Sequence, residues 1–400
     1  MNISDFSEKA LNNRTLKSIQ DVKIPTVDEY KVINILRDTI SQHDIKTINI
    51  FMVGPGLVGS TLLKQFKNQE KHLAEKQKMN LKIIGLANTK KMVISSEGID
   101  PDLWINVMEV SGEATDLQTF IKKMRDQNLP YTVFVDCTAS DEVAGLYNTI
   151  LQSNISIVTA NKKANSSNYA YYSELRNSSL SHNAAFAYET NVCAGLPIIR
   201  TIKDLISSGD QIEKIEGILS GTLSYIFNSF TNEKTFTEII KDAREKGFTE
   251  PDPREDLSGL DVARKLLILS REIGLMLEME NISIENLLPE KAIKAKTIEE
   301  FYEQMNLYQD EFERKKNNAL KNNKTLRYIA QIENNKAEIK LTEVGREHPF
   351  YLLSESDNIV AFTTKYYKER PLIIKGPGAG ADVTAAGVFA DILRISNFLR

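Results

Sequence analysis

Cysteine is scarce in this sequence. Only Cys137 and Cys193 occur among its 400 residues, which is too few for a disulfide framework and is typical of a reducing cytoplasm. Neither thiol belongs to a CxxC pair, and the four histidines form no paired-histidine motif, so no pattern typical of a zinc site is present. A nucleophilic cysteine would need a partnering base, and no local motif supplies one. We therefore expect a cytoplasmic protein without disulfides or zinc.

Long hydrophobic runs and a surplus of positive charge are also missing. No apolar run approaches the roughly 20 residues that a membrane-spanning helix needs, and Asp5 and Glu8 stand where a secretory signal would be apolar. Lys and Arg number 50 against 54 Asp and Glu, a net charge of -4. No dense basic stripe interleaved with aromatics is present. We therefore expect neither a membrane nor a nucleic-acid partner.

What is present is an ordinary globular composition, with 42% hydrophobic and 26% charged residues. A chain of 400 residues is longer than one typical domain, so two domains are expected. Residues 1–45 are polar, with a helical pattern over 27–40, and we interpret them as an extension or linker. We expect a nucleotide-binding domain over 46–193, completed by 370–400, and a substrate-binding and dimerisation domain over 194–369.

Strands and helices alternate in the first half of the chain. The β-branched content and the length of the run from Thr47 to Val53 are those of a buried parallel strand. Such alternation predicts a parallel sheet with right-handed crossovers, that is, an α/β Rossmann-type domain. The expected strands are 47–53, 81–87, 131–136 and 156–159, and the expected helices 60–66 and 142–153.

The pattern changes after about Asn191. Hairpins and helices now follow each other in a way that favours an α+β second domain. The expected helices are 198–207, 236–246, 258–273 and 298–318, and the expected strands are 214–219, 326–332, 337–344 and 359–364, with a turn at 334–335. The segment 372–380 and a helix over 383–395 are expected to return to the first domain.

A glycine-rich turn follows the first strand directly. Gly54, Gly56 and Gly59 have the GxGxxG spacing and stand between a buried strand and an amphipathic helix, with Leu57 and Val58 in between. In this context the glycines allow a tight turn, close approach of a pyrophosphate and close helix–strand packing, with the phosphate at the helix N-terminus. The turn therefore predicts a dinucleotide site; a plain strand-to-helix turn is the alternative.

Residues at the ends of the next strands refine this prediction. An NAD enzyme usually carries an acid after the second strand, whereas this chain has Asn88 followed by Lys90 and Lys91. These residues suit a 2′-phosphate and favour NADP with NAD tolerated, unless both lysines are simply solvated loop charges. Thr138 and Lys162 follow the third and fourth strands, where ligands gather in such sheets; for Lys162 a surface lysine pair is the alternative.

The segment 250–265 concentrates carboxylates and a lysine. Asp261 and Lys265 are four residues apart, on one face of the expected helix, and the preceding proline-containing turn can direct Glu250 and Asp256 to the same point. Such a mixture suits a small amino acid, whose ammonium needs carboxylates and whose reacting oxygen needs a cation. An exposed helix ion pair is the alternative interpretation.

Four further motifs accompany these features: Thr159–Asn165, Asn191–Pro197, Gly217–Ile226 and Gly376–Gly387. Taken together, the chain from Lys46 to its C-terminus resembles the homoserine dehydrogenases. Its acidic and final motifs are most similar to the dehydrogenase half of bifunctional aspartokinase–homoserine dehydrogenases. No kinase sequence is present, so we expect either a stand-alone enzyme or one half of a longer protein.

The resemblance implies NADPH-dependent reduction of L-aspartate 4-semialdehyde to L-homoserine, on the route to threonine, methionine and isoleucine. It implies Lys265 as the proton donor, and it makes substrate ligands of Glu250, Asp256, Asp261 and Thr222. A cationic lysine stabilises a developing alkoxide and then donates its proton, so the reverse oxidation should favour high pH. The cofactor residues that it implies are Gly54, Gly56, Leu57, Val58, Gly59, Asn88, Thr138, Lys162, Gly247 and Gly380.

The resemblance also implies a monovalent cation such as sodium, and a homodimer or homotetramer formed through the second domain. The cation would be held mostly by backbone oxygens, and Cys193 replaces a glycine common in this motif. The implied ligands are Glu189, Val192, Ala194 and Leu196. Two rival functions remain: a different amino-acid dehydrogenase on the same scaffold, and a catalytically silent nucleotide sensor, which would have lost Lys265 or Asp261.

Overall fold

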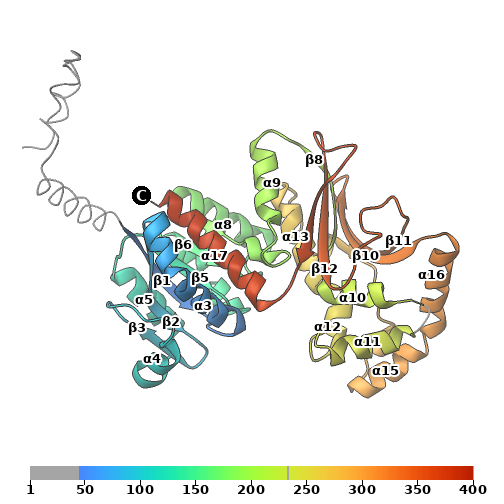
Figure 1. Cartoon of the computed structure of the whole chain (residues 1–400), viewed down its shortest axis with the longest axis horizontal. Coiled ribbons are helices and arrows are strands. Elements are labelled where there is room, and N and C mark those ends of the chain that lie inside the picture. The colour runs from blue at the N-terminus through green and yellow to red at the C-terminus, as the bar shows by residue number, and fades with distance from the viewer. Residues whose placement is uncertain (1–44, 232–233, 400) are drawn as a thin grey trace, which may run out of the picture.

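The computed structural model describes residues 45–231 and 234–399, which form two sheets with helices packed against them (Figure 1). The helical stretch expected at 27–40 lies outside these residues. The first sheet belongs to the N-terminal half and the second to the C-terminal half, with the closing helix α17 (Ala381–Phe398) lying against the first. The predicted fold class, a Rossmann-type parallel-sheet domain with an α+β partner, is confirmed.

The first sheet has seven strands in the order β4-β3-β2-β1-β5-β6-β7. Five of these strands run parallel to one another, because helical crossovers join them. Two short strands extend one edge by antiparallel pairing, β3 with β2 and β4 with β3. The parallel strands are β1 (Lys46–Val53), β2 (Met79–Ala87), β5 (Thr132–Asp136), β6 (Ser156–Thr159) and β7 (Phe186–Ala187), and the edge strands are β3 (Lys91–Ile94) and β4 (Glu113–Ala114).

Helices cover both faces of this sheet, which is why β1 is apolar on both sides. Ile50 of β1 packs with α3 (Leu57–His72) and α17, whose Phe66 and Phe389 rings meet edge to face at 5.1 Å. Phe51 points to the opposite face and packs against Phe120. The other helices here are α4 (Trp104–Ser111), α5 (Leu117–Asp126), α6 (Asp141–Ala144), α7 (Tyr147–Leu151), α8 (Tyr169–Ser181) and the π-helix η2 (Leu73–Gln77).

The second sheet has six strands in the order β13-β12-β8-β10-β11-β9, nearly all antiparallel. Its strands are β8 (Ile212–Ile218), β9 (Ile282–Ile284), β10 (Thr325–Glu333), β11 (Lys336–Val344), β12 (Asp357–Thr364) and β13 (Leu372–Pro377). The accompanying helices are η3 (Glu189–Asn191), α9 (Ile198–Ser207), α10 (Gly221–Ser229), α11 (Phe236–Glu245), α12 (Pro253–Leu257), α13 (Leu260–Glu272), η4 (Met279–Asn281), α14 (Glu290–Ile293), α15 (Ile298–Asn306) and α16 (Gln309–Lys321).

Two helices that the sequence predicts as continuous are divided. The helix expected over 142–153 is broken at Gly145, which ends α6. The helix expected over 298–318 is broken after α15, where Leu307 and Tyr308 donate to carbonyls only three residues back and tighten the chain into a turn. The periodicity carries no sign of these breaks, because the apolar positions on either side remain in phase.

The return of the chain to the first domain also comes later than predicted. Residues 372–377 form β13, which pairs antiparallel with β12 in the second sheet. Only α17 reaches the first sheet, so the expected return at 370 is wrong by about the length of one strand. Gly380, with a φ of 117°, is the residue at which the chain turns into α17.

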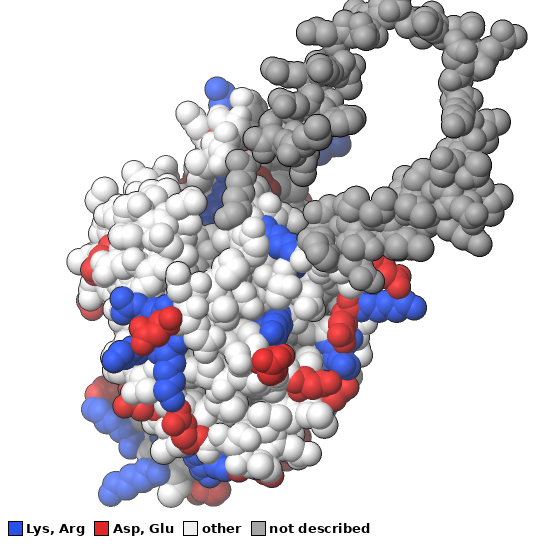
Figure 2. Space-filling view, turned by 90° about the vertical axis from the view of Figure 1, so that its left-hand side faces the viewer, with Lys and Arg blue, Asp and Glu red and all other residues white. Residues whose placement is uncertain are grey.

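Charges of both signs are interspersed on the face of the molecule in Figure 2, around a mainly uncharged central area. Among the described residues, no helix is long and apolar enough to cross a bilayer.

Candidate active site

The GxGxxG turn joins β1 to α3, where the sequence predicts it. Gly54 has a φ of 81°, and a Cβ there would lie 2.6 Å from Thr138 Cγ2. A Cβ on Gly59 would lie 2.3 Å from the Gly54 carbonyl oxygen, whereas the position of a Cβ on Gly56 is open. Gly54 and Gly59 thus permit the close packing of the turn. The open space at Gly56 lets a ligand approach the backbone at the start of α3.

A cavity of about 1220 Å³ lies beside this turn, at the carboxyl ends of β1, β2 and β5. These strands flank the point where the strand order reverses, the usual ligand position in such sheets. The predicted residues Gly54, Gly56, Asn88 and Thr138 line it. Leu57, Val58, Gly59, Lys162, Gly247 and Gly380 do not.

The two lysines after β2 take different roles. The side-chain oxygen of Asn88 accepts hydrogen bonds from the backbone N–H groups of Lys90 and Lys91 at 2.8 Å, so Asn88 shapes this turn. The ammonium of Lys91 donates to the Glu109 carbonyl in the last turn of α4. Lys90 is exposed and lines the cavity. Only Lys90 is therefore placed for a 2′-phosphate.

A second cavity, of about 520 Å³, meets the first at Thr138 and Ala139, which line both. It brings together residues from the two domains: Lys162 follows β6 of the first sheet, whereas the acidic segment belongs to the second domain. The predicted substrate residues Glu250, Asp256 and Asp261 line this cavity. The sequence assigns Lys162 to the cofactor, but the structure turns its side chain toward the acidic segment.

Helix α13 positions the central charged group of this cavity. It begins after Gly259, which has a φ of 72°, and its first turn carries Asp261. One carboxylate oxygen of Asp261 lies 2.8 Å from Lys162 Nζ and the other 2.9 Å from Lys265 Nζ. A single carboxylate therefore bridges two ammonium groups, one from each domain.

The Lys265 ammonium is buried behind Asp261 and donates to the Leu219 carbonyl at 2.6 Å. Lys265 itself does not line the cavity, although Asp261 does. Burial alone would lower the pKa of Lys265, yet the charge of Asp261 and its hydrogen bond raise that pKa above the ordinary lysine value. The amine is thus held protonated behind Asp261, which lines the cavity.

The pKa values of Asp261 and Lys162 are both lowered, for different reasons. Burial raises the pKa of Asp261, but Lys265 and Lys162 outweigh this and hold it well below the ordinary range. Burial, followed by repulsion from Lys265, lowers the pKa of Lys162 despite its contact with Asp261. Lys162 therefore gives up its proton more readily than Lys265, whose pKa is raised.

The Asp256 carboxylate is already hydrogen-bonded within the protein. Its two oxygens accept hydrogen bonds from Thr222 Oγ1 at 2.9 Å and from the Glu250 backbone N–H at 2.8 Å, and burial raises its pKa. Thr222 Oγ1 also lies within hydrogen-bond distance of the Phe248 carbonyl oxygen. Asp256 and Thr222 thus shape the loop 248–256. The Glu250 carboxylate is exposed and has no hydrogen bond or ion pair among the described residues, so it is open to a ligand.

A buried network that the sequence does not signal supports the carboxyl end of β5. The Asp136 carboxylate accepts hydrogen bonds from the Thr138 N–H at 2.6 Å, the Tyr147 hydroxyl at 2.6 Å and the Asn161 amide at 3.0 Å. Asn161 also donates to the Ser140 carbonyl. Burial raises the pKa of Asp136. These bonds position Thr138 at the junction of the two cavities.

The residues implied for a cation lie on η3 and the loop that follows it. Both oxygens of the Glu189 carboxylate accept backbone N–H groups at the start of α9, from Ile199 at 2.7 Å and Arg200 at 3.0 Å. The Leu196 carbonyl accepts from Ile198 N–H. The carbonyls of Val192 and Ala194 accept no hydrogen bond within residues 45–231 and 234–399.

No group of three or more acidic, histidine or cysteine side chains in the described parts of the chain could hold a metal ion. A cation here would therefore depend on backbone oxygens. Val192 and Ala194 offer such oxygens. The backbone turns sharply here, because Cys193 and Ala194 have positive φ angles of 57° and 52°.

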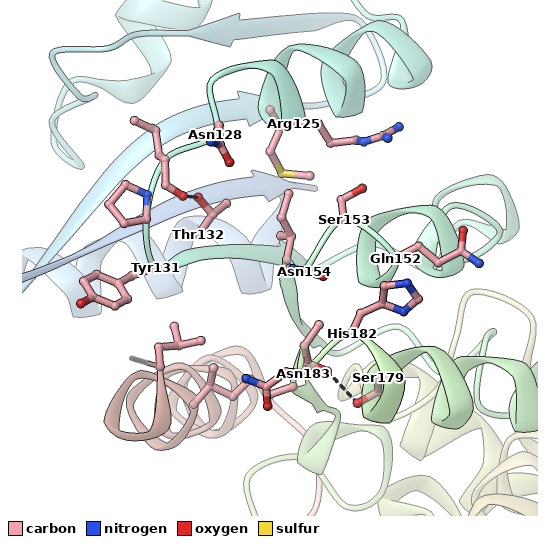
Figure 3. A pocket seen from close by; sticks show the side chains of 18 of the residues that line it. Arg125, Asn128, Tyr131, Thr132, Gln152, Ser153, Asn154, Ser179, His182 and Asn183 are labelled. Atoms are coloured by element: carbon pink, nitrogen blue, oxygen red, sulfur yellow. Dashed lines mark hydrogen bonds between the residues drawn. The ribbon is translucent and has the colours of Figure 1, made fainter.

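A third cavity, of about 840 Å³, lies at the amino ends of β5, β6 and β7, the end of the first sheet opposite the glycine turn (Figure 3). It is formed where α5, α7 and α8 end, and Asn128, Asn154 and Asn183 stand there in left-handed conformation just beyond the three helices. Because none of the predicted site residues lines it, this cavity is separate from the candidate active site.

Comparison with known proteins follows the same division of the chain. The family model described as "Homoserine dehydrogenase, NAD binding domain" matches residues 54–189, and the model described as "Homoserine dehydrogenase" matches residues 197–393. A homoserine dehydrogenase of Schizosaccharomyces pombe is 38% identical over 88% of this chain and 96% of its own length.

Other relatives are longer proteins. A chloroplastic bifunctional aspartokinase/homoserine dehydrogenase of Zea mays is 43% identical over 88% of this chain but only 39% of its own length. The chain thus spans about two fifths of the bifunctional relatives it matches.

Among solved structures, a Candida auris protein of unknown function is 36% identical, with a TM-score of 0.82 over 88% of this chain and 99% of that one. A hyperthermophilic archaeal homoserine dehydrogenase in complex with NADPH is 23% identical and has the same fold, with a TM-score of 0.67 over 88% of this chain and 100% of that one.

Proposed function

Because the chain belongs to the homoserine dehydrogenase family, we propose that it reduces L-aspartate 4-semialdehyde to L-homoserine with NADPH. The observation that carries this proposal is the bridge made by Asp261 between Lys162 and Lys265, at 2.8 and 2.9 Å. This bridge lies in a cavity that shares Thr138 with the cavity at the GxGxxG turn.

The glycines at the turn suit a dinucleotide, since Gly56 lines the cavity and leaves its backbone accessible. Bound NADPH supplies a hydride to the aldehyde carbon. The buried Lys265 ammonium stabilises the negative charge that develops on the aldehyde oxygen and donates the proton that completes the hydroxyl group. Asp261 keeps this amine charged and, through Lys162, holds the two walls of the cavity together.

The amino-acid end of the substrate requires a separate contact. Glu250 offers an exposed, uncommitted carboxylate to the substrate ammonium, whereas Asp256 and Thr222 act by holding the Glu250 backbone in place. We assign Lys90 to the 2′-phosphate of NADPH, because it lines the cofactor cavity and Lys91 is engaged elsewhere.

We further propose that the Val192 and Ala194 carbonyls hold a monovalent cation, with Leu196 as a weaker ligand and Glu189 as the residue that organises the loop. Replacing sodium by tetramethylammonium, which is too large for a pocket of backbone carbonyls, would then lower the melting temperature. An unchanged melting temperature would remove the cation from this loop.

We also propose that the protein is a cytoplasmic homodimer or homotetramer joined through its second domain. Both cysteines are unpaired, as in a reducing compartment. Light scattering after size-exclusion chromatography measures the oligomer directly, and a monomer at micromolar concentration would contradict this proposal.

The proposed reaction is tested by following homoserine-dependent reduction of NADP⁺ and NAD⁺ by absorbance, with other hydroxy amino acids as competitors. We expect Lys265→Met to lower kcat by about 10²- to 10⁴-fold, the usual contribution of a proton-transfer group, with the Kd for NADPH unchanged. Lys163→Met is the matched control, since Lys163 lines the same cavity but pairs with Asp141. Near-normal turnover in Lys265→Met would exclude this lysine as the donor.

A further inference from the structure

Helix α13 is joined twice to the same loop of the first domain, the loop 160–168 between β6 and α8. One contact is the ion pair of Lys162 with Asp261, at the start of the helix and inside the substrate cavity. The other is made by Arg271, in the last turn of α13, outside the residues that line the cavity. The first contact belongs to the proposed site, whereas the second has no part in the chemistry described so far.

The Arg271 guanidinium is fully enclosed, with a side-chain exposure of 0%. Nη1 donates to the carbonyls of Asn165 at 2.9 Å and Ser167 at 2.8 Å. Nε and Nη2 both donate to the Leu277 carbonyl, at 3.1 and 2.9 Å, and Nη2 also lies 3.0 Å from Glu278 Oε2. Each of the three guanidinium nitrogens is thus engaged, and two of the bonds cross to the first domain.

The far side of the loop is equally well held. The Asn165 amide nitrogen donates to Asn191 Oδ1 at 2.8 Å, and its side-chain oxygen accepts from Arg176 Nη2 at 2.9 Å. Earlier in the loop, Asn161 donates to Asp136 and to the Ser140 carbonyl. Hydrogen bonds therefore hold the loop on both sides of Lys162, at Asn161 and at Asn165.

Glu278 extends the same contact. While one of its oxygens faces Arg271, the other accepts the backbone N–H of Tyr169, the first residue of α8. The Arg271 guanidinium also lies 5.1 Å from the centre of the Tyr172 ring of that helix. Arg271 thus connects the end of α13 to both the loop 160–168 and the helix that follows it.

We propose that Arg271 is a positioning residue that sets the loop carrying Lys162 against the helix carrying Asp261 and Lys265. The inference rests on the proposed function, since it assigns Arg271 a part in the same reaction. A buried cation is costly unless it is fully hydrogen-bonded. An apolar side chain could fill the space that Arg271 occupies. The planar, forked guanidinium also fixes the angle between α13 and the loop 160–168.

Arg271→Lys tests this inference, because it keeps the positive charge but cannot reproduce the forked geometry. A misplacement of about 1 Å near the reacting atoms costs on the order of 10²-fold in rate, so we expect kcat to fall by roughly 10- to 100-fold. The Kd for NADPH should not change, since residues of the first domain alone line the cofactor cavity.

The pH profile gives a readout that a purely structural role would not move. The charged and titratable groups near Lys265 are Asp261 on the same helix, Lys162 from the loop, Cys193 and Asp256. Withdrawal of Lys162 removes a positive charge, which raises the pKa of Lys265. The pH at which homoserine oxidation becomes half-maximal should therefore rise, by roughly half a unit or more.

Arg327→Lys is the matched control. Arg327 is also a buried arginine that donates to backbone carbonyls, those of Phe350, Tyr351 and Leu353, but it joins segments of the second domain only. We expect it to lose stability to a similar extent, with kcat and the pH profile unchanged.

A crystal structure of Arg271→Lys decides the inference independently of catalysis. Separation of Lys162 Nζ and Asp261 Oδ1 well beyond their 2.8 Å contact supports it, and an unaltered pair overturns it. Unchanged kcat and pH profile in an active, folded variant would also overturn it, as would equal losses in Arg327→Lys. A wild-type protein without homoserine-dependent activity would instead refute the proposed function. The distance between Lys162 and Asp261 in Arg271→Lys would then still test whether Arg271 positions this pair.

Discussion

At the scale of single residues, the site depends on one carboxylate shared by two amines. Asp261 keeps Lys265 protonated although burial opposes this, and it holds Lys162 from the other domain. The sequence places Asp261 and Lys265 on one helix face by spacing alone. It assigns Lys162 to the cofactor, because nothing local indicates that a residue 99 positions away approaches Asp261.

Asp261→Asn should therefore move the pH dependence of the reaction. Without the carboxylate, burial lowers the pKa of Lys265, so this amine loses its proton at lower pH. In the oxidation of homoserine, which needs the amine to accept a proton, activity should rise at lower pH than in the wild type, with a reduced maximum. The kcat/KM profile for homoserine measures this.

Glu255→Gln is the control for Asp261→Asn, because Glu255 lines the same cavity and is not paired with either lysine among the described residues. A shift of the profile to higher pH in Asp261→Asn would contradict the role given to its charge.

Lys90→Ala tests the choice of cofactor. A charge-assisted hydrogen bond contributes about 1.5–3 kcal/mol, so we expect the KM for NADP⁺ to rise by roughly 10- to 100-fold. The KM for NAD⁺, which lacks the phosphate, should not change. Lys91→Ala should change neither constant appreciably, because its ammonium faces the Glu109 carbonyl. Equal effects on both nucleotides in Lys90→Ala would show that the lysine does not bind the 2′-phosphate.

At the scale of elements, α13 is the helix on which the proposed reaction depends. It carries Asp261 and Lys265 near its start and Arg271 near its end, and glycines in left-handed conformation precede and follow it: Gly259 with a φ of 72° and Gly274 with a φ of 91°. The sequence predicts this helix almost to its ends, since apolar periodicity and flanking glycines are local signals.

Gly259→Ala should disturb both stability and catalysis. A left-handed non-glycine residue costs about 1–2 kcal/mol, and here the new Cβ would also lie 2.8 Å from the Tyr328 hydroxyl oxygen. Gly274→Ala is the control beyond the other end of α13, because Gly274 is also left-handed, with a φ of 91°, but its Cβ would meet nothing within 4 Å. We expect chemical denaturation to give a larger loss for Gly259→Ala, and only this variant to lower kcat. Equal effects would mean that α13 does not depend on its starting point.

At the scale of the whole molecule, the candidate site exists only where the two domains meet. Residues of the first domain alone line the cofactor cavity, whereas the substrate cavity takes Thr138 and Lys162 from the first domain and Glu250 and Asp261 from the second. Each ligand should therefore affect the stability of the molecule differently.

We expect NADPH to raise the melting temperature by itself, since a ligand at 100 times its Kd stabilises the folded state by about 2.7 kcal/mol. Homoserine should raise it more when NADP⁺ is present than when it is absent, because the two cavities share Thr138 and Ala139. Thermal-shift measurements with each ligand and with both test this. Strictly additive shifts would indicate that the cavities are independent.

The cavity at the amino ends of β5, β6 and β7 can be compared with the substrate cavity in size and lining (Figure 3). It is larger than the substrate cavity, at about 840 against 520 Å³, but smaller than the cofactor cavity of about 1220 Å³, and left-handed asparagines at helix ends line it. The substrate cavity is therefore distinguished by its opposed charges and not by its size.

The sequence by itself determined the features that depend on neighbours along the chain: the glycine turn after β1, the i,i+4 pair on α13 and the alternation that makes a parallel sheet. The tertiary structure alone decided that Lys162 meets Asp261, that Glu189 caps α9, and that β13 joins the second sheet. These contacts join residues that are separated along the chain by stretches of very different length. They are stabilised by burial and by charge neutralisation. A local pattern carries no record of such partners, and only the folded chain brings them together.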